Sequence, residues 1–134
     1  MIVVDTNIIS YLFLPSKFSE LTEELISKDP HWIAPIIWRS EFRNVLAGYI
    51  RNDLIEFEDS TAIMNRAENL LNDNEYQVSS ISVLNLVLNS NCSAYDCEYV
   101  ALAKQTKTFL VTQDKKLLKN FPEIAFPLDS IPGF

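Results

Sequence analysis

Four acidic residues, far apart in the chain, occupy positions from which their carboxylates can meet and hold a cation. Asp5 ends an apolar run at the start of the sequence, and Asp114 lies two residues beyond another. Asp96 falls in the first turn of one predicted helix, and Glu41 lies within the apolar stripe of another. Carboxylates brought together raise one another's pKa unless a cation separates them. Because the ligand atoms are all oxygen, we expect a hard ion, Mg²⁺ or Mn²⁺, rather than zinc.

A hard divalent ion held in this way favours phosphodiester hydrolysis. The ion polarises a phosphoryl oxygen, lowers the pKa of a bound water and neutralises the leaving oxygen of an in-line displacement. The residue types therefore predict a metal-dependent hydrolase. In this hypothesis the same four carboxylates are the metal ligands and the catalytic groups: Asp5, Glu41, Asp96 and Asp114.

The elements that must position these carboxylates alternate between strands and helices. Buried or alternating apolar runs predict strands over residues 2–4, 31–34, 76–80 and 108–112. Helical spacing predicts helices over residues 16–28, from Pro35 onward, over 58–72, 83–88 and 94–106, and around Leu117 and Leu118. Residues 5–7 are predicted to form a turn, so that the first helix opens at Pro15 and Ser16. This alternation implies parallel strands joined by right-handed crossovers, an open α/β sandwich.

In such a sheet the binding crevice lies outside the carboxyl ends of the strands. Asp5 and Asp114 reach that edge directly, because each follows a predicted strand. Helices that connect parallel strands run antiparallel to them, so the start of each helix is level with the same edge. We therefore expect Asp96 and Glu41 to approach the same rim from their helices.

Each acidic residue also has a purely structural interpretation. Asp5 is able to hydrogen-bond its own turn, and Asp114 is a suitable helix N-cap. Ser93 and Asp96 have the spacing of a capping box. Glu41 is harder to explain this way, because a carboxylate in an apolar stripe needs a partner. Its chain neighbours Arg39 and Arg43 are expected to project to another side of the helix, which leaves a lysine from elsewhere as an alternative partner.

Amino-acid composition limits the number of domains and the classes of ligand that the protein can bind. The 134 residues, 48% of them hydrophobic, predict one globular domain over 1–134. Two glycines exclude a P-loop or a dinucleotide-binding loop, and a net charge of −7 means that any nucleic-acid contact must be local. Cys92 and Cys97 are expected to be reduced, buried thiols. Without a signal-peptide pattern or an apolar run of bilayer length, a soluble, cytoplasmic protein is expected, with no membrane partner.

Several motifs together carry a family resemblance that spans the whole chain. They are Val3-Val4-Asp5-Thr6-Asn7, Ser40-Glu41, Tyr95-Asp96 followed by Tyr99-Val100-Ala101-Leu102-Ala103, and Leu110-Val111-Thr112-Gln113-Asp114 with Leu117. In their order and spacing the sequence resembles the PIN-domain ribonucleases, in particular the VapC-type toxins of bacterial and archaeal toxin–antitoxin pairs. The resemblance implies a three-layer sandwich with a mainly parallel five-stranded sheet, and an acidic quartet that holds one or two Mg²⁺ or Mn²⁺ ions.

The resemblance also implies supporting residues and partners. Thr6, Asn7 and Thr112 would be polar groups that support the acidic site, and RNA would be the substrate. A cognate antitoxin would lie along a groove formed by residues 11–25, where Phe13, Leu14 or Phe18 would be contacts if exposed. The alternative for each of the three is that it packs in the core. The protein would form a homodimer. Five lysines near the carboxyl terminus either follow a phosphate backbone or form a solvated face: Lys104, Lys107, Lys115, Lys116 and Lys119.

Three other functions are weighed against the ribonuclease. A phosphohydrolase of the haloacid dehalogenase type would use Asp5 as nucleophile but needs a second carboxylate two residues later, where Asn7 stands. A Ser-His-Asp hydrolase would have to use His31, the only histidine, which falls in a predicted strand. A PIN-like module that binds RNA or protein without cleavage is the main alternative, although such a module has no need for four mutually repelling acids.

Overall fold

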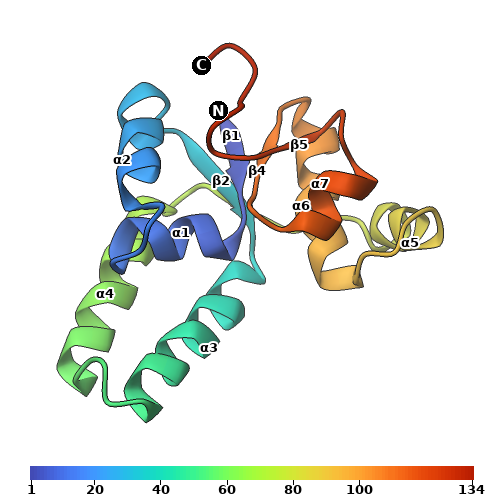
Figure 1. Ribbon diagram of the computed structural model, residues 1–134. Helices are drawn as coiled ribbons and strands as arrows, with labels where there is room; N and C mark the ends of the chain where they lie inside the picture. Colours follow the sequence, from blue (N-terminus) through green and yellow to red (C-terminus); the bar gives the residue numbers. More distant parts are fainter.

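The computed structural model describes residues 1–134, and its centre is one sheet of five parallel strands in the order β3-β2-β1-β4-β5 (Figure 1). The strands are β1 (Ile2–Val4), β2 (Trp32–Pro35), β3 (Glu75–Tyr76), β4 (Leu110–Val111) and β5 (Ala125–Phe126). All three residues of β1 are buried, and Val3 pairs with Ile33 on one side and Leu110 on the other. A wholly apolar strand suits this central position, because helices cover a parallel sheet on both faces.

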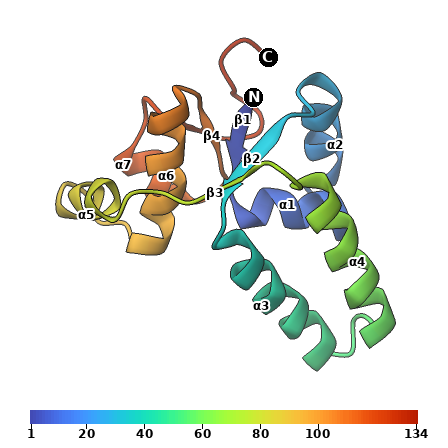
Figure 2. The same cartoon turned by 180° about the vertical axis from the view of Figure 1, so that it is seen from behind.

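Seven helices flank the sheet, as predicted for an α/β sandwich. They are α1 (Thr6–Phe13), α2 (Ser19–Lys28), α3 (Trp38–Arg51), α4 (Phe57–Leu70), α5 (Ser80–Leu88), α6 (Ala94–Thr106) and α7 (Lys115–Asn120). The first four gather to one side of the central strands and the last three to the other, as opposite views show (Figures 1 and 2). Helix α6 packs against β1, β2 and β4, and α5 packs on α6. The predicted fold class is therefore confirmed.

The chain after β1 is a helix, where we predicted a turn. Asp5 is the N-cap of α1, and its Oδ1 accepts the backbone N–H of Ile8 at 3.1 Å. The β-branched Ile8 and Ile9 lower the intrinsic helix propensity of this segment. Both side chains are nevertheless fully buried in the core, so tertiary packing outweighs local preference. The next helix correspondingly begins at Ser19 rather than at residues 15–16.

Strand β5 is the second element that the residue pattern did not predict. It contains only Ala125 and Phe126, which pair with Leu110 and Val111 of β4. A two-residue strand is too short to show alternation, so only the family resemblance had implied a fifth strand. The ring of Phe126 packs edge-on against Phe109, with the centroids 4.9 Å apart.

Helices α3 and α4 contact one another and extend away from the sheet (Figure 2). Arg39 of α3 donates from Nε to Glu75 Oε2 at 2.6 Å and also pairs with Glu68 of α4. This side chain therefore points away from Glu41, as expected. Because Arg39 ties α3 to α4 and β3, it fixes the base of the helix that carries Glu41.

The expectation for the cysteines is met, since Cys92 and Cys97 are free and buried. His31, predicted to lie in a strand, instead directly precedes β2, and its Nε2 lies 3.0 Å from Asn74 Oδ1 at an exposed position. No helix combines the length and apolar character that crossing a bilayer requires.

Candidate functional site

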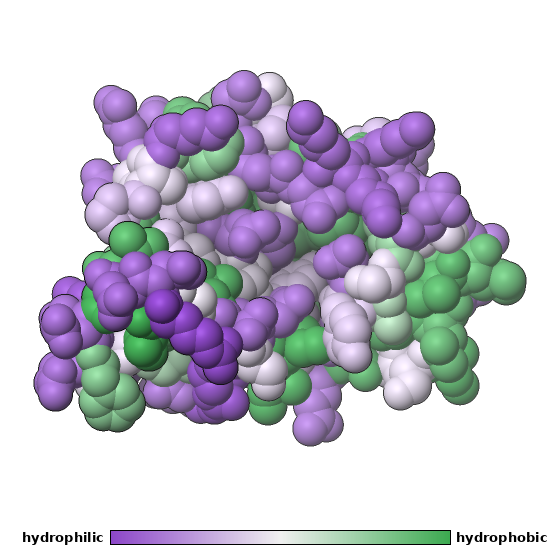
Figure 3. All heavy atoms as spheres, turned by 60° about the horizontal axis from the view of Figure 1, so that its bottom comes forward, coloured by the Kyte–Doolittle hydropathy of each residue, from purple (hydrophilic) through white to green (hydrophobic).

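One pocket receives side chains from all four predicted acidic positions. It has a volume of about 240 Å³ and is lined by Asp5, Thr6, Asn7, Glu41, Asn44, Val45, Asp96, Tyr99 and Asp114. Asp5 follows central strand β1, and the other acids come from the first turns of α3 and α6 and from the N-cap of α7. Figure 3 shows the face at this end of the molecule, where hydrophilic side chains surround a hollow. The fold thus brings the four carboxylates to one edge of the sheet.

Asp5 is the most buried of these carboxylates. Its Oδ1 accepts from the Ile8 backbone, and its Oδ2 accepts a hydrogen bond from the Thr112 hydroxyl. Burial raises the pKa of Asp5 from 3.8 to about 6, because the two hydrogen bonds only partly offset the loss of solvent. The charges of Asp114 and Glu41 raise this pKa further. Asp5 is therefore a carboxylate whose charged form lacks a compensating cation within the protein.

Thr112 connects two of the acidic residues. Its hydroxyl donates to Asp5 and accepts the backbone N–H of Asp114 at 3.0 Å. Since Thr112 is fully buried at the end of β4, it holds both groups in a fixed relation. The structure thus gives Thr112 a supporting position next to the acids, as the family resemblance implied.

Glu41 has hydroxyl partners rather than the lysine considered from the sequence. Its Oε1 accepts from Tyr99 at 2.6 Å and from Thr6 at 2.9 Å. The two hydroxyl oxygens are themselves 2.7 Å apart. These contacts explain how a carboxylate is accommodated within an apolar helix stripe, because each buried polar atom has a partner.

Asp96 and Asp114 lie at helix N-termini, but they differ in their bonding. Asp114 Oδ1 caps α7 by accepting the backbone N–H groups of Lys116 and Leu117 at 2.8 and 3.0 Å. Ser93 caps α6 by accepting the backbone N–H of Asp96 at 3.1 Å. The Asp96 side chain makes no return bond, so the reciprocal capping box is not formed. The capping interpretation is therefore correct for Asp114 and wrong for the Asp96 carboxylate.

The pocket gathers four acidic side chains without a basic side chain to balance their charge. The pKa of Asp96 is raised, first by burial and then by the charge of Asp114, while nearby Lys116 opposes the shift. No lysine, arginine or histidine lines the pocket. The donor set fits a hard divalent cation, because carboxylate oxygens converge without histidine or cysteine. As they stand, however, no three of these side chains are close enough to form a preformed metal centre.

The remaining polar residues of the pocket are neutral. Thr6 bonds Glu41, whereas Asn7 lines the pocket without a hydrogen bond to Asp5. Asn44 and Tyr99 also line the pocket and were not predicted as site residues. Asn44 follows Glu41 by three residues, so helical spacing was the signal that places both on one face. Tyr99 follows Asp96 by three residues in α6, but its apolar surroundings in the sequence made it resemble a core residue.

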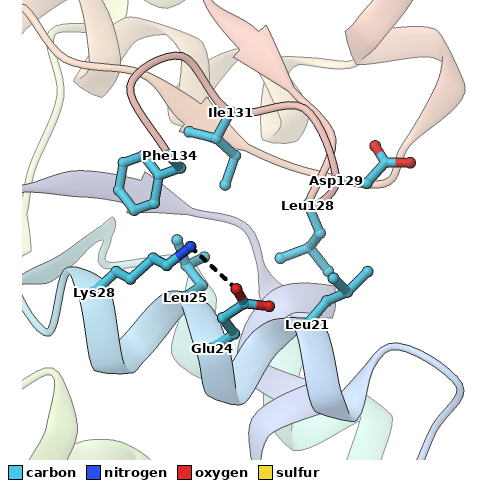
Figure 4. A pocket seen from close by; sticks show the side chains of 8 residues that line it. All are labelled: Leu21, Glu24, Leu25, Lys28, Leu128, Asp129, Ile131 and Phe134. Carbon is cyan, nitrogen blue, oxygen red and sulfur yellow. Dashed lines mark ion pairs between the residues drawn. The ribbon is translucent and has the colours of Figure 1, made fainter.

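A second pocket, between α2 and the last residues of the chain, is different in character (Figure 4). It has a volume of about 200 Å³ and is lined by Leu21, Glu24, Leu25, Lys28, Leu128, Asp129, Ile131 and Phe134. The Lys28 ammonium and the Glu24 carboxylate pair across one helical turn at 3.0 Å. Because its lining is mainly aliphatic and its cation is already paired, this pocket offers no comparable convergence of reactive groups.

Of the two interpretations of Phe13, Leu14 and Phe18, the structure favours core packing over exposed antitoxin contacts. Leu14 is buried in the core, with 4% of its surface accessible. Phe13 and Phe18 are partly buried and pack against Phe42 and Tyr11, with ring centroids 6.4 and 4.8 Å apart. These apolar side chains therefore pack α1 and the start of α2 against the rest of the protein. Leu14 directly follows α1 as its C-cap.

The fold and the pocket define an α/β protein with an acidic, oxygen-donor site at the carboxyl edge of a parallel sheet. The model of the PIN domain family matches residues 2–126, and the chain belongs to this family. Among named relatives, Ribonuclease VapC3 of Pyrobaculum aerophilum is 27% identical over 139 residues, which cover 94% of this chain and 98% of the relative.

Two solved structures support the same fold. The crystal structure of FitAcB from Neisseria gonorrhoeae aligns over 98% of this chain and 100% of its own, with a TM-score of 0.76 and 17% identity. A toxin–antitoxin complex from Klebsiella pneumoniae aligns over 96% of this chain and 98% of its own, with a TM-score of 0.66 and 17% identity. At these identities the two structures establish the fold alone.

Proposed function

We propose that this PIN-domain protein is a Mg²⁺- or Mn²⁺-dependent endoribonuclease, with residues 1–134 acting as one domain. The observation that carries the proposal is the convergence of four carboxylates on one pocket that no basic residue lines. Such an arrangement is costly for a fold unless a cation binds there. The 27% identity to a relative named as a ribonuclease supports RNA as the substrate.

The proposed roles follow from the contacts of each side chain. Asp5, Glu41, Asp96 and Asp114 would hold the metal, which when bound supplies electrophilic stabilisation of the phosphodiester and lowers the pKa of an attacking water. Three of them keep at least one oxygen without a hydrogen bond to the protein, since only Oε1 of Glu41 and Oδ1 of Asp114 are engaged and Asp96 accepts none.

Neutral groups would orient the acids and the substrate. Thr112 fixes the Asp5 carboxylate through its hydrogen bond. Asn7 and Asn44 line the same pocket and offer amide donors to phosphate oxygens and acceptors to sugar hydroxyls. Their neutrality suits a site in which the ion, rather than a basic side chain, meets the negative charge of RNA.

The direct test is cleavage of a labelled RNA by purified protein. We expect cleavage with Mg²⁺ or Mn²⁺, loss of cleavage with a chelator, and loss in the variant Asp5→Asn. The matched control is Asp53→Asn, which removes one exposed carboxylate at the end of α3 and far along that helix from Glu41. Asparagine also tolerates the positive φ of 56° at this position. Cleavage without metal or independent of Asp5 would contradict the proposed mechanism, and no cleavage by clean, folded protein would instead favour a binding module.

The proposed biological setting is that of the toxin in a type II toxin–antitoxin pair. A toxin–antitoxin complex from Klebsiella pneumoniae shares the fold over nearly the whole chain, which supports an antitoxin partner. Residues 11–25 are the proposed contact segment. Co-expression with the product of an adjacent short open reading frame should suppress RNA cleavage, whereas co-expression that leaves cleavage unchanged would contradict this setting.

The homodimer implied by the family resemblance would use an exposed apolar surface on α5. Ile81, Leu84 and Leu88 are 82%, 62% and 81% exposed and recur at helical spacing. Helix α5 lies at the right in Figure 1, and a hydrophobic patch covers the same side in Figure 3. No residue from 77 to 94 is charged, in a chain of net charge −7. A second copy of the chain therefore meets least repulsion here, and exposed apolar stripes of this kind mark interfaces.

The oligomeric state tests this surface directly. We propose Ile81→Asp and Leu88→Asp, because both side chains are exposed in the single chain and their replacement leaves the core intact. Light scattering after size-exclusion chromatography should report a dimer for the natural sequence and a monomer for the variants. The control Leu54→Asp changes an equally apolar, 65% exposed side chain at the far end of α3 and should stay dimeric. A monomeric natural sequence would overturn the dimer.

A further inference from the structure

Tyr99 places a hydroxyl group in the interior of the molecule, beside a carboxylate of the pocket. The residue is 2% exposed in the middle of α6. Its hydroxyl lies 2.6 Å from Glu41 Oε1 and 2.7 Å from Thr6 Oγ1, and Thr6 Oγ1 lies 2.9 Å from the same carboxylate oxygen. Three elements of the fold, α1, α3 and α6, therefore meet through three oxygen atoms.

The number of protons in this triangle decides the direction of its hydrogen bonds. Two hydroxyl groups supply one proton each, and an ionised carboxylate supplies none. A tyrosine phenol is protonated near neutral pH, so Tyr99 is the donor in its bond to Glu41 Oε1. Tyr99 thus donates to Glu41 Oε1, and Thr6 donates either to the same oxygen or to the phenol oxygen. Glu41 Oε1 accepts at least one hydrogen bond in either case.

The other oxygen of Glu41 is left in a defined position. Oε2 has no hydrogen bond to any protein group, and Glu41 and Tyr99 both line the pocket. A carboxylate that is held at one oxygen by a buried hydroxyl has less freedom to rotate before an ion arrives. Outer hydrogen bonds of this kind typically change metal affinity or activity by 10- to 100-fold when they are removed.

Packing alone does not account for the hydroxyl. A phenylalanine would fill the same volume in the core, whereas a buried hydroxyl costs free energy unless it is partnered. The partner here is not a backbone group that needed satisfying but a side chain of the acidic pocket. We propose that Tyr99 is a positioning residue, which together with Thr6 fixes Glu41 so that its free oxygen serves the divalent ion. This inference rests on the proposed metal-dependent function.

The test is the affinity for Mn²⁺ alone, measured by calorimetry without RNA. The variant Tyr99→Phe removes one hydroxyl and keeps the buried ring, and we expect its Mn²⁺ dissociation constant to rise 10- to 100-fold. The matched control is Tyr95→Phe, which removes the same hydroxyl from a 62% exposed tyrosine one turn earlier in α6. This control should bind Mn²⁺ as the natural sequence does.

A second pair of variants keeps the proposal testable if Tyr99→Phe fails to fold. Thr6→Val removes the other donor and should weaken Mn²⁺ binding, whereas Thr6→Ser restores the hydroxyl and should recover it. A role confined to packing would show lower thermal stability with unchanged Mn²⁺ affinity in both the Tyr99 and Thr6 variants, and that result overturns the proposal.

The outcomes separate this inference from the proposed function. If the natural sequence binds Mn²⁺ and Tyr99→Phe binds it within twofold, the positioning role is wrong while the nuclease proposal stands. If Mn²⁺ binds, Tyr99→Phe weakens it and no RNA is cleaved, the positioning role stands while the nuclease proposal fails. If the natural sequence binds no Mn²⁺, both are overturned.

Discussion

The acidic pocket has an interior half and a rim half, and the fold supports them in opposite ways. In the interior half, Asp5 and Glu41 accept hydrogen bonds from the hydroxyls of Thr112, Tyr99 and Thr6. In the rim half, Asp114 bonds backbone N–H groups of its own helix, and the Asp96 carboxylate bonds nothing in the protein. Long-range contacts thus fix one half, and local contacts or none fix the other.

This difference indicates that the two halves have different roles in binding an ion. Groups tied by buried contacts between distant segments cannot move without disturbing the core, so the interior half is preorganised. Groups at helix N-termini keep the freedom to adjust when a cation or a substrate arrives. No three side chains of the pocket form a ready-made metal centre, so some carboxylates must move to hold an ion, and those of the rim half have the fewest long-range contacts.

The largest effect is expected from the interior half, with Asp5→Asn. Asparagine remains a good N-cap for α1, so the fold is kept. Loss of the charged ligand oxygen should lower metal-dependent RNA cleavage by about a thousandfold, because removing a ligand costs more than removing a group that supports one. Single-turnover cleavage with circular dichroism as the folding control measures this. Activity within tenfold of the natural sequence would show that the interior carboxylate is not essential.

A somewhat smaller effect concerns stability and pH. Because the pKa of Asp5 in the folded protein is raised to about 6, the folded state binds this proton more tightly than the unfolded state does. The contribution of Asp5 to stability is therefore present below pH 4 and is lost as the pH rises towards 7. The difference corresponds to about 3 kcal/mol. Urea unfolding with a chelator should show this decline in the natural sequence and a shallower one in Asp5→Asn; parallel curves would contradict it.

Binding of a divalent ion should restore the stability that is lost as the pH rises towards 7. Binding to the folded state alone stabilises it by about 2.7 kcal/mol when the free ion is at a hundred times its dissociation constant. We expect Mn²⁺ to raise the unfolding free energy at pH 7 and to do so less as the pH falls below 6, where protons compete for Asp5. Thermal unfolding with and without Mn²⁺ measures the gain. Calcium provides a control for general charge screening, since it prefers more ligands and longer distances. A gain that is independent of pH would contradict competition at Asp5.

The smallest effect on stability is expected at Asp114 in the rim half, where variants distinguish its role as a helix cap from its role as a metal ligand. Asp114→Ala removes the α7 cap and should cost about 1 kcal/mol of unfolding free energy, whereas Asp114→Asn retains an acceptor and should cost little. Both should impair metal-dependent cleavage. Ser93→Ala should cost a similar amount at the α6 cap while leaving every carboxylate in place. If Asp114→Asn keeps full activity, Asp114 is a helix cap only.

The sequence predicted the structure correctly where the local residue pattern reflects the place of a segment in the fold. Ile2–Val4 is apolar throughout because it lies in the centre of a covered sheet, and Asp5 and Asp114 follow strands whose ends define the pocket. Knowledge of which way helices run between parallel strands then sufficed to bring Asp96 and Glu41 to the same edge. The acidic lining of the pocket was therefore predictable from the order and spacing of these residues.

The parts that sequence reasoning missed depend on contacts between distant segments. Asp5, Thr6 and Asn7 have the composition of a turn, and only the burial of Ile8 and Ile9 makes α1 the better structure. Tyr99 is followed by apolar residues in the sequence. The role of its hydroxyl is visible only from its hydrogen bond to Glu41, which lies 58 positions away in the chain. No local window of sequence contains that pairing.

The shortness of the outer strands has a consequence for assembly. Strands β3 and β5, which end the sheet on its two sides, contain two residues each. Such short borders present few free backbone donors and acceptors, so another chain has little on which to extend the sheet. Fibrous growth by strand addition is therefore disfavoured, and any association between copies must rely on side chains of the helices.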